Sequence, residues 1–246
     1  MKQILILLLS LSFSFSYSQL STRTIEVKSG QMDKFIEMAG KKTKKYNNEE
    51  GSARFWTYEI LTGSDAGKIW RMRYASAEYM DNWDTNSEES KYWMKNVSPY
   101  ISNGSVNGNY MWSYYGDMSH NVDSDNQNHV MALIYTYKAS GEQDFWRFRG
   151  RVKRAMTESG YASRMSVLVC NSGCNGNVVQ VRFHHDGFAG QNSDYGEPLQ
   201  SMISKYNELF GEDAYEQDSG KASDALEENG RSIRHHELIP ELSSGW

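Results

Sequence analysis

Two arginines at matched positions are the side chains of this sequence best suited to hold a ligand. When residues 28–74 are shifted by 110 positions onto residues 138–183, with one residue dropped in a turn, Arg73 falls on Arg182. A guanidinium presents a planar fork that binds a carboxylate or another oxyanion through two hydrogen bonds. We therefore predict that Arg73 and Arg182 bind a ligand as an anion clamp. An internal ion-pair network, or an edge open to water, is the alternative, because a buried charge needs a partner.

Two pairs of adjacent histidines supply the other candidate groups, His184-His185 and His235-His236. Neighbours on a strand point to opposite faces, so each pair sends one imidazole inward. We predict that His184 and His235 join the ligand site. Two imidazoles with Asp186 would suit a transition metal, but the spacing matches no zinc signature. We therefore predict no metal and no cofactor, and ordinary hydrogen-bonded histidines remain the alternative.

The sequence contains two cysteines, Cys170 and Cys174. In an exported chain such a pair most simply forms a disulfide that closes a turn. Free thiols and metal ligation are the alternatives. Motifs for other chemistry are missing from the sequence: it has no nucleophile elbow, no phosphate-binding glycine loop and no His-Glu-x-x-His.

The first 18 residues have the pattern of an export signal. Lys2 supplies a positive charge, residues 4–11 are apolar, and Ser16-Tyr17-Ser18 places small residues at a cleavage site. The apolar run is shorter than the roughly 20 residues of a membrane span. We predict a bacterial signal peptide at residues 1–18, cleavage after Ser18, and a secreted or periplasmic protein with no membrane span. An uncleaved anchor is the alternative.

Composition and charge argue against a nucleic-acid partner. The 246 residues carry a net charge of −5, with 31 acidic and 26 basic side chains, whereas a nucleic-acid binder needs a concentrated basic surface. The 16 tyrosines and 7 tryptophans suit cores, interfaces and surfaces for planar ligands alike. A small-molecule ligand is therefore the partner we expect, and the sequence does not indicate an oligomeric state.

The elements that must position these groups occur in the same order in both halves of the chain. In the first half, apolar periodicity predicts strands at 22–27, 54–61, 68–74 and 110–115, and helices at 32–46, 76–83 and 92–97. In the second half it predicts strands at 130–137, 164–170, 177–184 and 231–238, helices at 142–158 and 197–210, a glycine-rich loop at 187–196, and a weak helix or mobile lobe at 213–229. Four lysines at the end of the first helix are predicted to be solvated, with a binding patch as the alternative: Lys41, Lys42, Lys44 and Lys45.

Each half therefore reads strand, helix, strand, strand, helix, strand, which gives a four-stranded antiparallel sheet with two helices on one face. Residues 119–128 are polar and predict a linker, so we expect one α+β repeat at 19–118 and a second at 129–246. The strand at 130–137 is apolar on both faces and needs cover on both sides. The predicted fold is α+β, with two ferredoxin-like βαββαβ repeats packed sheet to sheet as an intrachain α/β barrel.

This order and the apparent duplication resemble a tandem version of the dimeric α/β-barrel families, which include antibiotic-biosynthesis monooxygenase-like and NIPSNAP-like proteins. The resemblance implies that any chemistry would use polar and aromatic groups in a cavity beneath the helices, without a cofactor. Asn82-Trp83 invites that comparison, but the second half has Gln191-Asn192 near the same place and no tryptophan. No catalytic role is transferred to these residues.

Two functions follow as hypotheses. The first is an exported bacterial protein that binds a small ligand or a partner without catalysis. The alternative is a cofactor-independent monooxygenase-like or haem-handling oxidoreductase, so the sequence leaves open whether the protein is an enzyme. A roomy pocket on which Arg73, Arg182 and His184 converge would favour a ligand.

Overall fold

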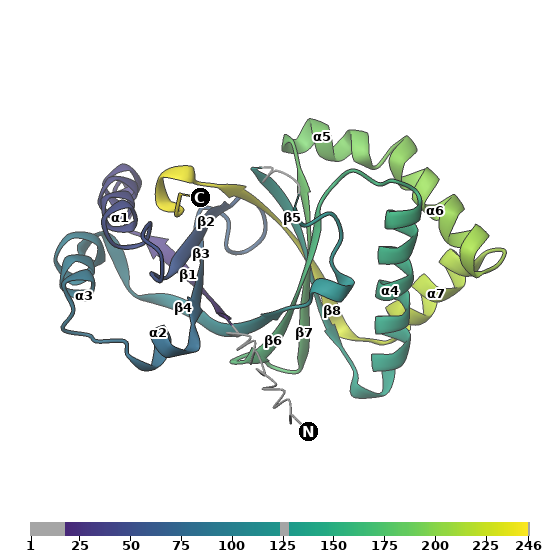
Figure 1. Ribbon diagram of the computed structural model, residues 1–246, viewed down its shortest axis with the longest axis horizontal. Coiled ribbons are helices and arrows are strands. Elements are labelled where there is room, and N and C mark those ends of the chain that lie inside the picture. The colour runs from purple at the N-terminus through teal and green to yellow at the C-terminus, as the bar shows by residue number, and fades with distance from the viewer. Residues whose placement is uncertain (1–17, 124–127, 246) are drawn as a thin grey trace, which may run out of the picture.

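Eight antiparallel strands form one closed barrel, and the helices lie outside it (Figure 1). This computed structural model describes residues 18–123 and 128–245, without the side chains of residues 18, 19 and 103–108. The predicted signal peptide at residues 1–18 therefore lies outside the described residues, apart from Ser18 at its end. Within the described residues, no helix is long and apolar enough to cross a membrane.

The first half of the barrel has the strand order β4-β1-β3-β2. Its strands are β1 (Ser18–Val27), β2 (Arg54–Ile60), β3 (Ile69–Ser76) and β4 (Ile101–Tyr114). Three helices cover the outer face of this sheet: α1 (Met32–Tyr46), α2 (Ala77–Asp81) and α3 (Glu88–Tyr92), and α3 runs on into a single π-helical turn, Trp93–Val97. The long α1 forms because its apolar residues recur every three to four positions and so share one face.

The second half has the corresponding strand order, β8-β5-β7-β6. Its strands are β5 (His129–Tyr137), β6 (Met165–Ser172), β7 (Asn177–His185) and β8 (Leu226–Leu238). Its helices are α4 (Glu142–Glu158), α5 (Gly187–Asp194), α6 (Glu197–Phe210) and α7 (Ala214–Asp224). In Figure 1, α4, α6 and α7 cover the outer face of this sheet.

The two sheets meet edge to edge, because β2 pairs with β8 and β4 pairs with β6. The predicted α+β barrel is confirmed. Its two halves, however, form one continuous closed sheet, whereas the sequence predicted two sheets packed face to face. Closure leaves no free strand edge in the barrel, which removes the usual site of unwanted strand pairing.

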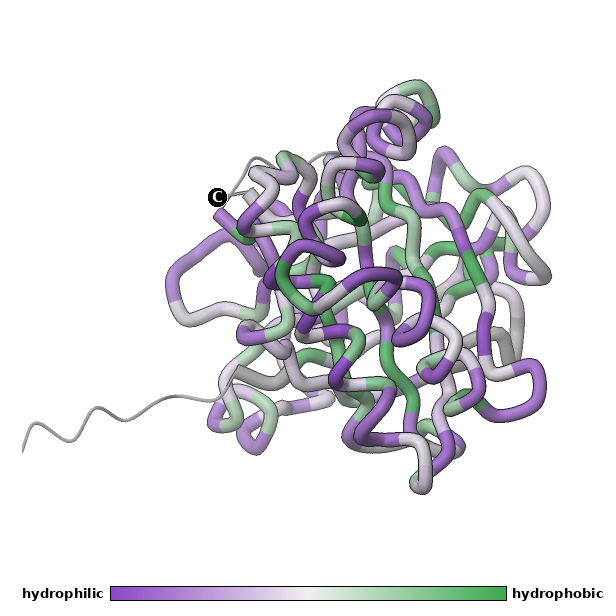
Figure 2. The backbone as a smooth tube through the Cα atoms, turned by 90° about the vertical axis from the view of Figure 1, so that its right-hand side faces the viewer, coloured by the Kyte–Doolittle hydropathy of each residue, from purple (hydrophilic) through white to green (hydrophobic). Residues whose placement is uncertain are grey.

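Alternation along each strand divides the buried residues between the barrel interior and two outer cores. On β3, Trp70 and Met72 point into the barrel, while Ile69 packs outward against α1. On β5, Val130 points inward, while Met131 packs beneath the helices of the second half. Figure 2 shows hydrophobic and hydrophilic residues interleaved along the chain. The prediction that β5 is covered on both faces is correct.

Several element boundaries differ from the sequence-based expectation. β4 begins at Ile101, well before the predicted residue 110, because its pairing with β1 overrides the turn-forming composition of 103–108. The expected glycine-rich loop at 187–196 is largely the helix α5. At the start of the predicted linker, His120 forms a bridge with Met165 and the Ser119 hydroxyl accepts a hydrogen bond from the Val167 amide.

Candidate functional site

A cavity of about 520 Å³ lies between the first sheet and the helices α1 to α3. We call it the cationic pocket. Its described lining contains four basic side chains and a single carboxylate, together with an aromatic wall: Arg23, Lys42, Arg71, Arg73, Glu89, Phe55, Trp83, Trp93 and Tyr110. The size falls within the range of about 300–1,000 Å³ found for small-molecule pockets.

Strand alternation brings the three arginines to this pocket. Arg71 and Arg73 occupy the positions of β3 that point away from the barrel interior, toward the helices. Arg23 lies on β1 directly opposite Arg71 in the antiparallel register. Like charges placed opposite each other across strands destabilise a sheet. The fold therefore keeps a cluster of positive charge that its own packing does not require.

Arg71 is 1% exposed and has no carboxylate partner among the described residues. Its Nη2 donates a hydrogen bond of 2.8 Å to the Thr43 hydroxyl, and its guanidinium lies 4.1 Å from the centre of the Phe55 ring. Its Nε and Nη1 have no hydrogen-bond partner. Burial, followed by repulsion from Arg23, lowers the pKa of Arg71 to about 9. The group is therefore still charged at neutral pH, and it lines the cationic pocket with two of its donors unpaired.

Lys42 and Glu89 form a buried polar network beside Arg71. The Lys42 ammonium donates to Glu89 and, at 2.7 Å, to the Asn47 side-chain oxygen. Tyr79 donates a 2.9 Å hydrogen bond to the second Glu89 oxygen. Burial, with repulsion from Arg71, lowers the pKa of Lys42 to about 7. Burial alone would raise the pKa of Glu89, but the charge and hydrogen bonds of Lys42, with those of Asn47 and Tyr79, outweigh it and hold that pKa below its usual value.

Lys42 is a functional candidate that the sequence analysis misplaced. It was expected to be solvated with its neighbours, yet it is 4% exposed, whereas Lys41 and Lys44 are exposed. The sequence did carry a usable signal, because Lys42 lies three residues after Ala39 and seven after Phe35, on the buried stripe of α1. The charge run masked this spacing.

The predicted residues Arg182 and His184 lie together in the barrel interior. Both line a cavity of about 300 Å³, which we call the barrel cavity. The Arg182 guanidinium lies 4.5 Å from the centre of the Trp70 ring and 5.0 Å from that of Tyr58. A ring nitrogen of His184, Nε2, is 3.3 Å from the Ser166 hydroxyl. Two of the four predicted ligand-binding residues thus line one cavity, and their binding of a ligand stays a prediction.

The expected convergence of Arg73 with Arg182 is not found. Arg73 faces outward into the cationic pocket, and Arg182 faces into the barrel. The alignment of the two halves skipped one residue in a turn, and a slip of one residue moves a strand side chain to the opposite face. The residue of β3 that faces inward beside this position is Met72.

His235 also lies apart from Arg182. Its Nδ1 is 3.1 Å from Nε2 of His129 on the outer face, and its ring lies 5.1 Å from that of Phe188 on α5. Its neighbour His236 is the inward-facing member of the pair, with Nδ1 3.4 Å from Nη1 of Arg182. No group of three or more histidine, cysteine, aspartate or glutamate side chains in the described residues is arranged to hold a metal ion.

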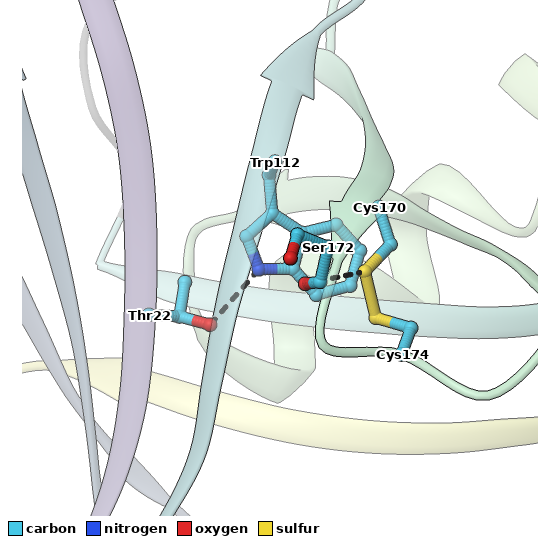
Figure 3. The surroundings of a disulfide bond; sticks show 5 residues. All are labelled: Thr22, Trp112, Cys170, Ser172 and Cys174. Carbon is cyan, nitrogen blue, oxygen red and sulfur yellow. Dashed lines mark hydrogen bonds between the residues drawn. A yellow bond between two sulfur atoms is a disulfide. The ribbon is translucent and has the colours of Figure 1, made fainter. Parts of the chain in front are cut away.

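The predicted disulfide between Cys170 and Cys174 is present and closes the turn between β6 and β7. Figure 3 shows it beside Trp112, whose indole N–H donates a 2.9 Å hydrogen bond to the Thr22 hydroxyl. The disulfide packs against the apolar interior of the barrel. This position indicates that the disulfide stabilises the fold at one end of the barrel.

No family model matches the sequence, and no curated protein matches it significantly. Solved structures do resemble the fold. A candidate monooxygenase from Fusobacterium nucleatum is 12% identical, with a TM-score of 0.62, over 92% of this chain and 94% of that one. A candidate monooxygenase from Lactobacillus acidophilus is 12% identical, with a TM-score of 0.56, over 91% and 93%.

Chlorite dismutase from Candidatus Nitrospira defluvii is 5% identical, with a TM-score of 0.54, over 93% of this chain and 94% of that one. At such identities the likeness concerns the fold alone. It extends over nearly the whole of each chain, and it agrees with the closed barrel and its two flanking helical layers. The chain therefore has the dimeric α/β-barrel (ferredoxin-like) fold that these proteins share, as its sequence predicted.

Proposed function

We propose that this protein binds a small organic anion with a flat apolar body in the cationic pocket. The observation that carries the proposal is Arg71, a charged and nearly fully buried side chain with two unused donors. Leaving such a cation unpaired is costly, whereas a bound carboxylate would supply its counter-charge and accept from one of the two unused donors. The ligand, in this view, supplies the missing partner.

The shape of the pocket supports the choice of an aromatic anion. Trp93 lies beneath the Arg23 guanidinium at 4.5 Å, and Trp83 lies 5.7 Å from that of Arg73. Each arginine is thus held against an aromatic face, and the remaining ring surface is available to a flat ligand. Phe55 closes the inner end of the pocket beneath Arg71.

The experiment is calorimetric titration with 2-naphthoate. We expect measurable binding to the native protein and an increase in Kd of about 10- to 100-fold for Arg71→Met, because a charge-assisted hydrogen-bonding group is lost. Arg154→Met is the matched control, since Arg154 is an exposed arginine on α4, and it should change Kd by less than about twofold. Equal affinities of native protein and Arg71→Met would refute the proposal, provided that circular dichroism shows that the variant is folded.

A second candidate function is cofactor-independent oxidation of such a ligand. Structural neighbours named as candidate monooxygenases favour it at the level of the fold. In this chain Lys42, with its pKa lowered to about 7, has the properties of a general base that could remove a proton from a bound phenol. Protein-dependent oxygen uptake with 1-naphthol, lost in Lys42→Met, would support it over simple binding.

The residues do not fit haem. Among the described residues, neither the cationic pocket nor the helix-covered cavity of the second half is lined by a histidine or a cysteine, which are the commonest axial ligands of haem iron. The buried histidines His184 and His236 lie in the barrel interior instead. We therefore expect no haem binding: the absorbance spectrum of haemin should be the same with and without the protein.

We further propose that the chain arose by duplication and is exported. The two halves have corresponding strand orders, which supports repeats at 19–118 and 129–246 joined by residues 119–128. The disulfide fits an oxidising compartment. Intact-mass measurement of protein from its own host should show loss of residues 1–18 and of two cysteine hydrogens, and a retained leader would contradict the export proposal.

A further inference from the structure

We propose that the barrel cavity is a second, separate binding site, for a small monocarboxylate about the size of benzoate. It lies inside the closed sheet, whereas the cationic pocket lies outside it beneath helices. The two cavities share no lining residue among the described residues. Arg182 and His184 line the barrel cavity, and Arg71 and Arg73 line the cationic pocket. The proposal therefore stands independently of the function proposed above.

The main observation is a buried cation without a counter-ion. Arg182 is 2% exposed, and its Nη2 has no hydrogen-bond partner. The guanidinium lies against the rings of Trp70 and Tyr58 and beside His236, and Tyr58 also hydrogen-bonds to it. No carboxylate lines the cavity in the described part of the chain. A guanidinium held between aromatic rings is fixed in orientation, so its free N–H is presented at a defined point.

Histidine side chains complete a polar end of the cavity without neutralising Arg182. Burial, followed by repulsion from Arg182, holds the pKa of both His184 and His236 well below the usual value. Both are therefore neutral at physiological pH. With Ser166 donating to Nε2 of His184, the tautomer that carries the proton on Nδ1 has a free donor, and Nδ1 has no partner in the structure.

These groups match the needs of one carboxylate. One ligand oxygen would accept from Nη2 of Arg182 and the other from Nδ1 of His184, so two unsatisfied buried donors would be paired together. The remaining walls are mostly apolar or aromatic and include Trp56, Met72 and Leu168, and Arg164 adds a second basic side chain to the lining. At about 300 Å³ the cavity is at the lower limit of ligand pockets, which favours a single aromatic ring over a larger body.

Access to the site lies at the rim formed by Tyr74 and Tyr114. These side chains are 40% and 45% exposed although they line the same cavity as the buried Arg182. The site thus has a solvent-exposed aromatic entrance and a buried charged end. A ligand with one charged and one apolar end would enter with its carboxylate first.

Methionine methyl groups allow the test to be made on the native protein. Met72 lines the barrel cavity, while Met94 and Met111 line the cationic pocket. In a methyl-labelled methionine NMR spectrum, benzoate at millimolar concentration should shift the Met72 signal in a saturable manner. An unchanged Met72 signal at saturating benzoate, or shifts confined to Met94 and Met111, would overturn the proposal.

Two variants then assign the binding energy. Arg182→Met should increase the Kd for benzoate, measured from the Met72 shift, by about 10- to 100-fold, while Arg71→Met should leave that Kd within about twofold. Leu168→Trp leaves the charged residues unsubstituted while adding bulk to the cavity lining, and it should abolish the Met72 response. Unchanged benzoate affinity in Arg182→Met, or loss of the Met72 response in Arg71→Met, would overturn the proposal. If Arg182→Met fails to fold, the native spectrum and Leu168→Trp still decide it.

Discussion

Arg71 in the cationic pocket and Arg182 in the barrel cavity are both buried against aromatic rings without a carboxylate partner among the described residues. Each guanidinium lies on aromatic rings, at 4.1 Å from Phe55 and 4.5 Å from Trp70, and each keeps at least one donor without a partner. Aromatic contact offsets part of the desolvation of a cation, but it does not replace a hydrogen-bonded anion. In both cavities the arginine therefore favours an anionic occupant over an apolar one.

Lys42 gives a pH prediction at the scale of the residue. Its pKa is about 7 in the folded protein against 10.5 for an ordinary lysine, so the unfolded chain binds more protons between these values. Stability must then rise with pH across this window, and the cost of burying the charge is fully present below pH 7. We expect the free energy of unfolding of native protein, relative to Lys42→Met, to increase by about 1 kcal/mol per pH unit between pH 7 and 10.

Urea unfolding at pH 7, 8 and 9 measures this difference. The control is Lys44→Met, which replaces an exposed lysine of the same helix and should follow the native pH profile. Parallel profiles for native protein and Lys42→Met would show that the folded protein does not lower the pKa of Lys42.

At the scale of single residues, the sequence indicates which side chains could bind a ligand more reliably than it indicates which face of a strand they occupy. Arg182 and His184 were both predicted as ligand-binding residues, and they line one cavity, although their binding of a ligand stays a prediction. The face occupied by Arg73 was not predictable, because a sequence repeat tolerates a one-residue shift that reverses a strand side chain. Likewise His236, not His235, faces Arg182, and adjacency alone cannot choose between the two.

At the scale of elements, the long helices and most strands were predicted close to their observed ranges, and two segments were not. α1 and α4 occupy the predicted ranges, because their apolar spacing is sustained over four turns or more. β4 begins earlier than predicted, and α5 replaces a loop. Both segments have distant partners: β4 pairs with β1, and the Asp194 carboxylate at the end of α5 accepts a 2.6 Å hydrogen bond from the Ser163 hydroxyl.

The disulfide of the β6–β7 turn gives a prediction for an element. Replacing both cysteines with alanine should lower the free energy of unfolding by about 2 kcal/mol, the value expected from chain entropy for so short a loop. Urea unfolding of Cys170→Ala/Cys174→Ala against oxidised native protein measures it. Native protein treated with a reductant is the control and should lose a similar amount. A variant as stable as the oxidised protein would indicate that the bridge closes a turn that is already formed without it.

At the scale of the whole molecule, the chain end fastens one half of the barrel to the other. Beyond β8, the Ile239 amide donates to the Thr57 carbonyl and the Ser244 amide to the Phe55 carbonyl, both at 2.8 Å, so the tail extends along β2. Figure 1 shows this C-terminal segment beside α1 and β2. Gly40 of α1 permits the approach, because a Cβ there would lie 2.8 Å from the Glu241 carbonyl oxygen.

Leu242 is the anchor of this tail, since it is fully buried with Phe35 and Ile69 in the outer core of the first half. Leu242→Ala should therefore destabilise the protein by about 2–5 kcal/mol, as for other buried leucines, although it lies at the far end of the chain from α1. Amide hydrogen exchange should accelerate in α1 more than in α4, because only α1 loses its packing partner. Ile233→Ala, which truncates a 43% exposed side chain on β8, should change neither measurement appreciably. If exchange instead accelerated equally in both helices, the two halves would unfold as one unit, and the tail would contribute to stability without acting as a local fastening.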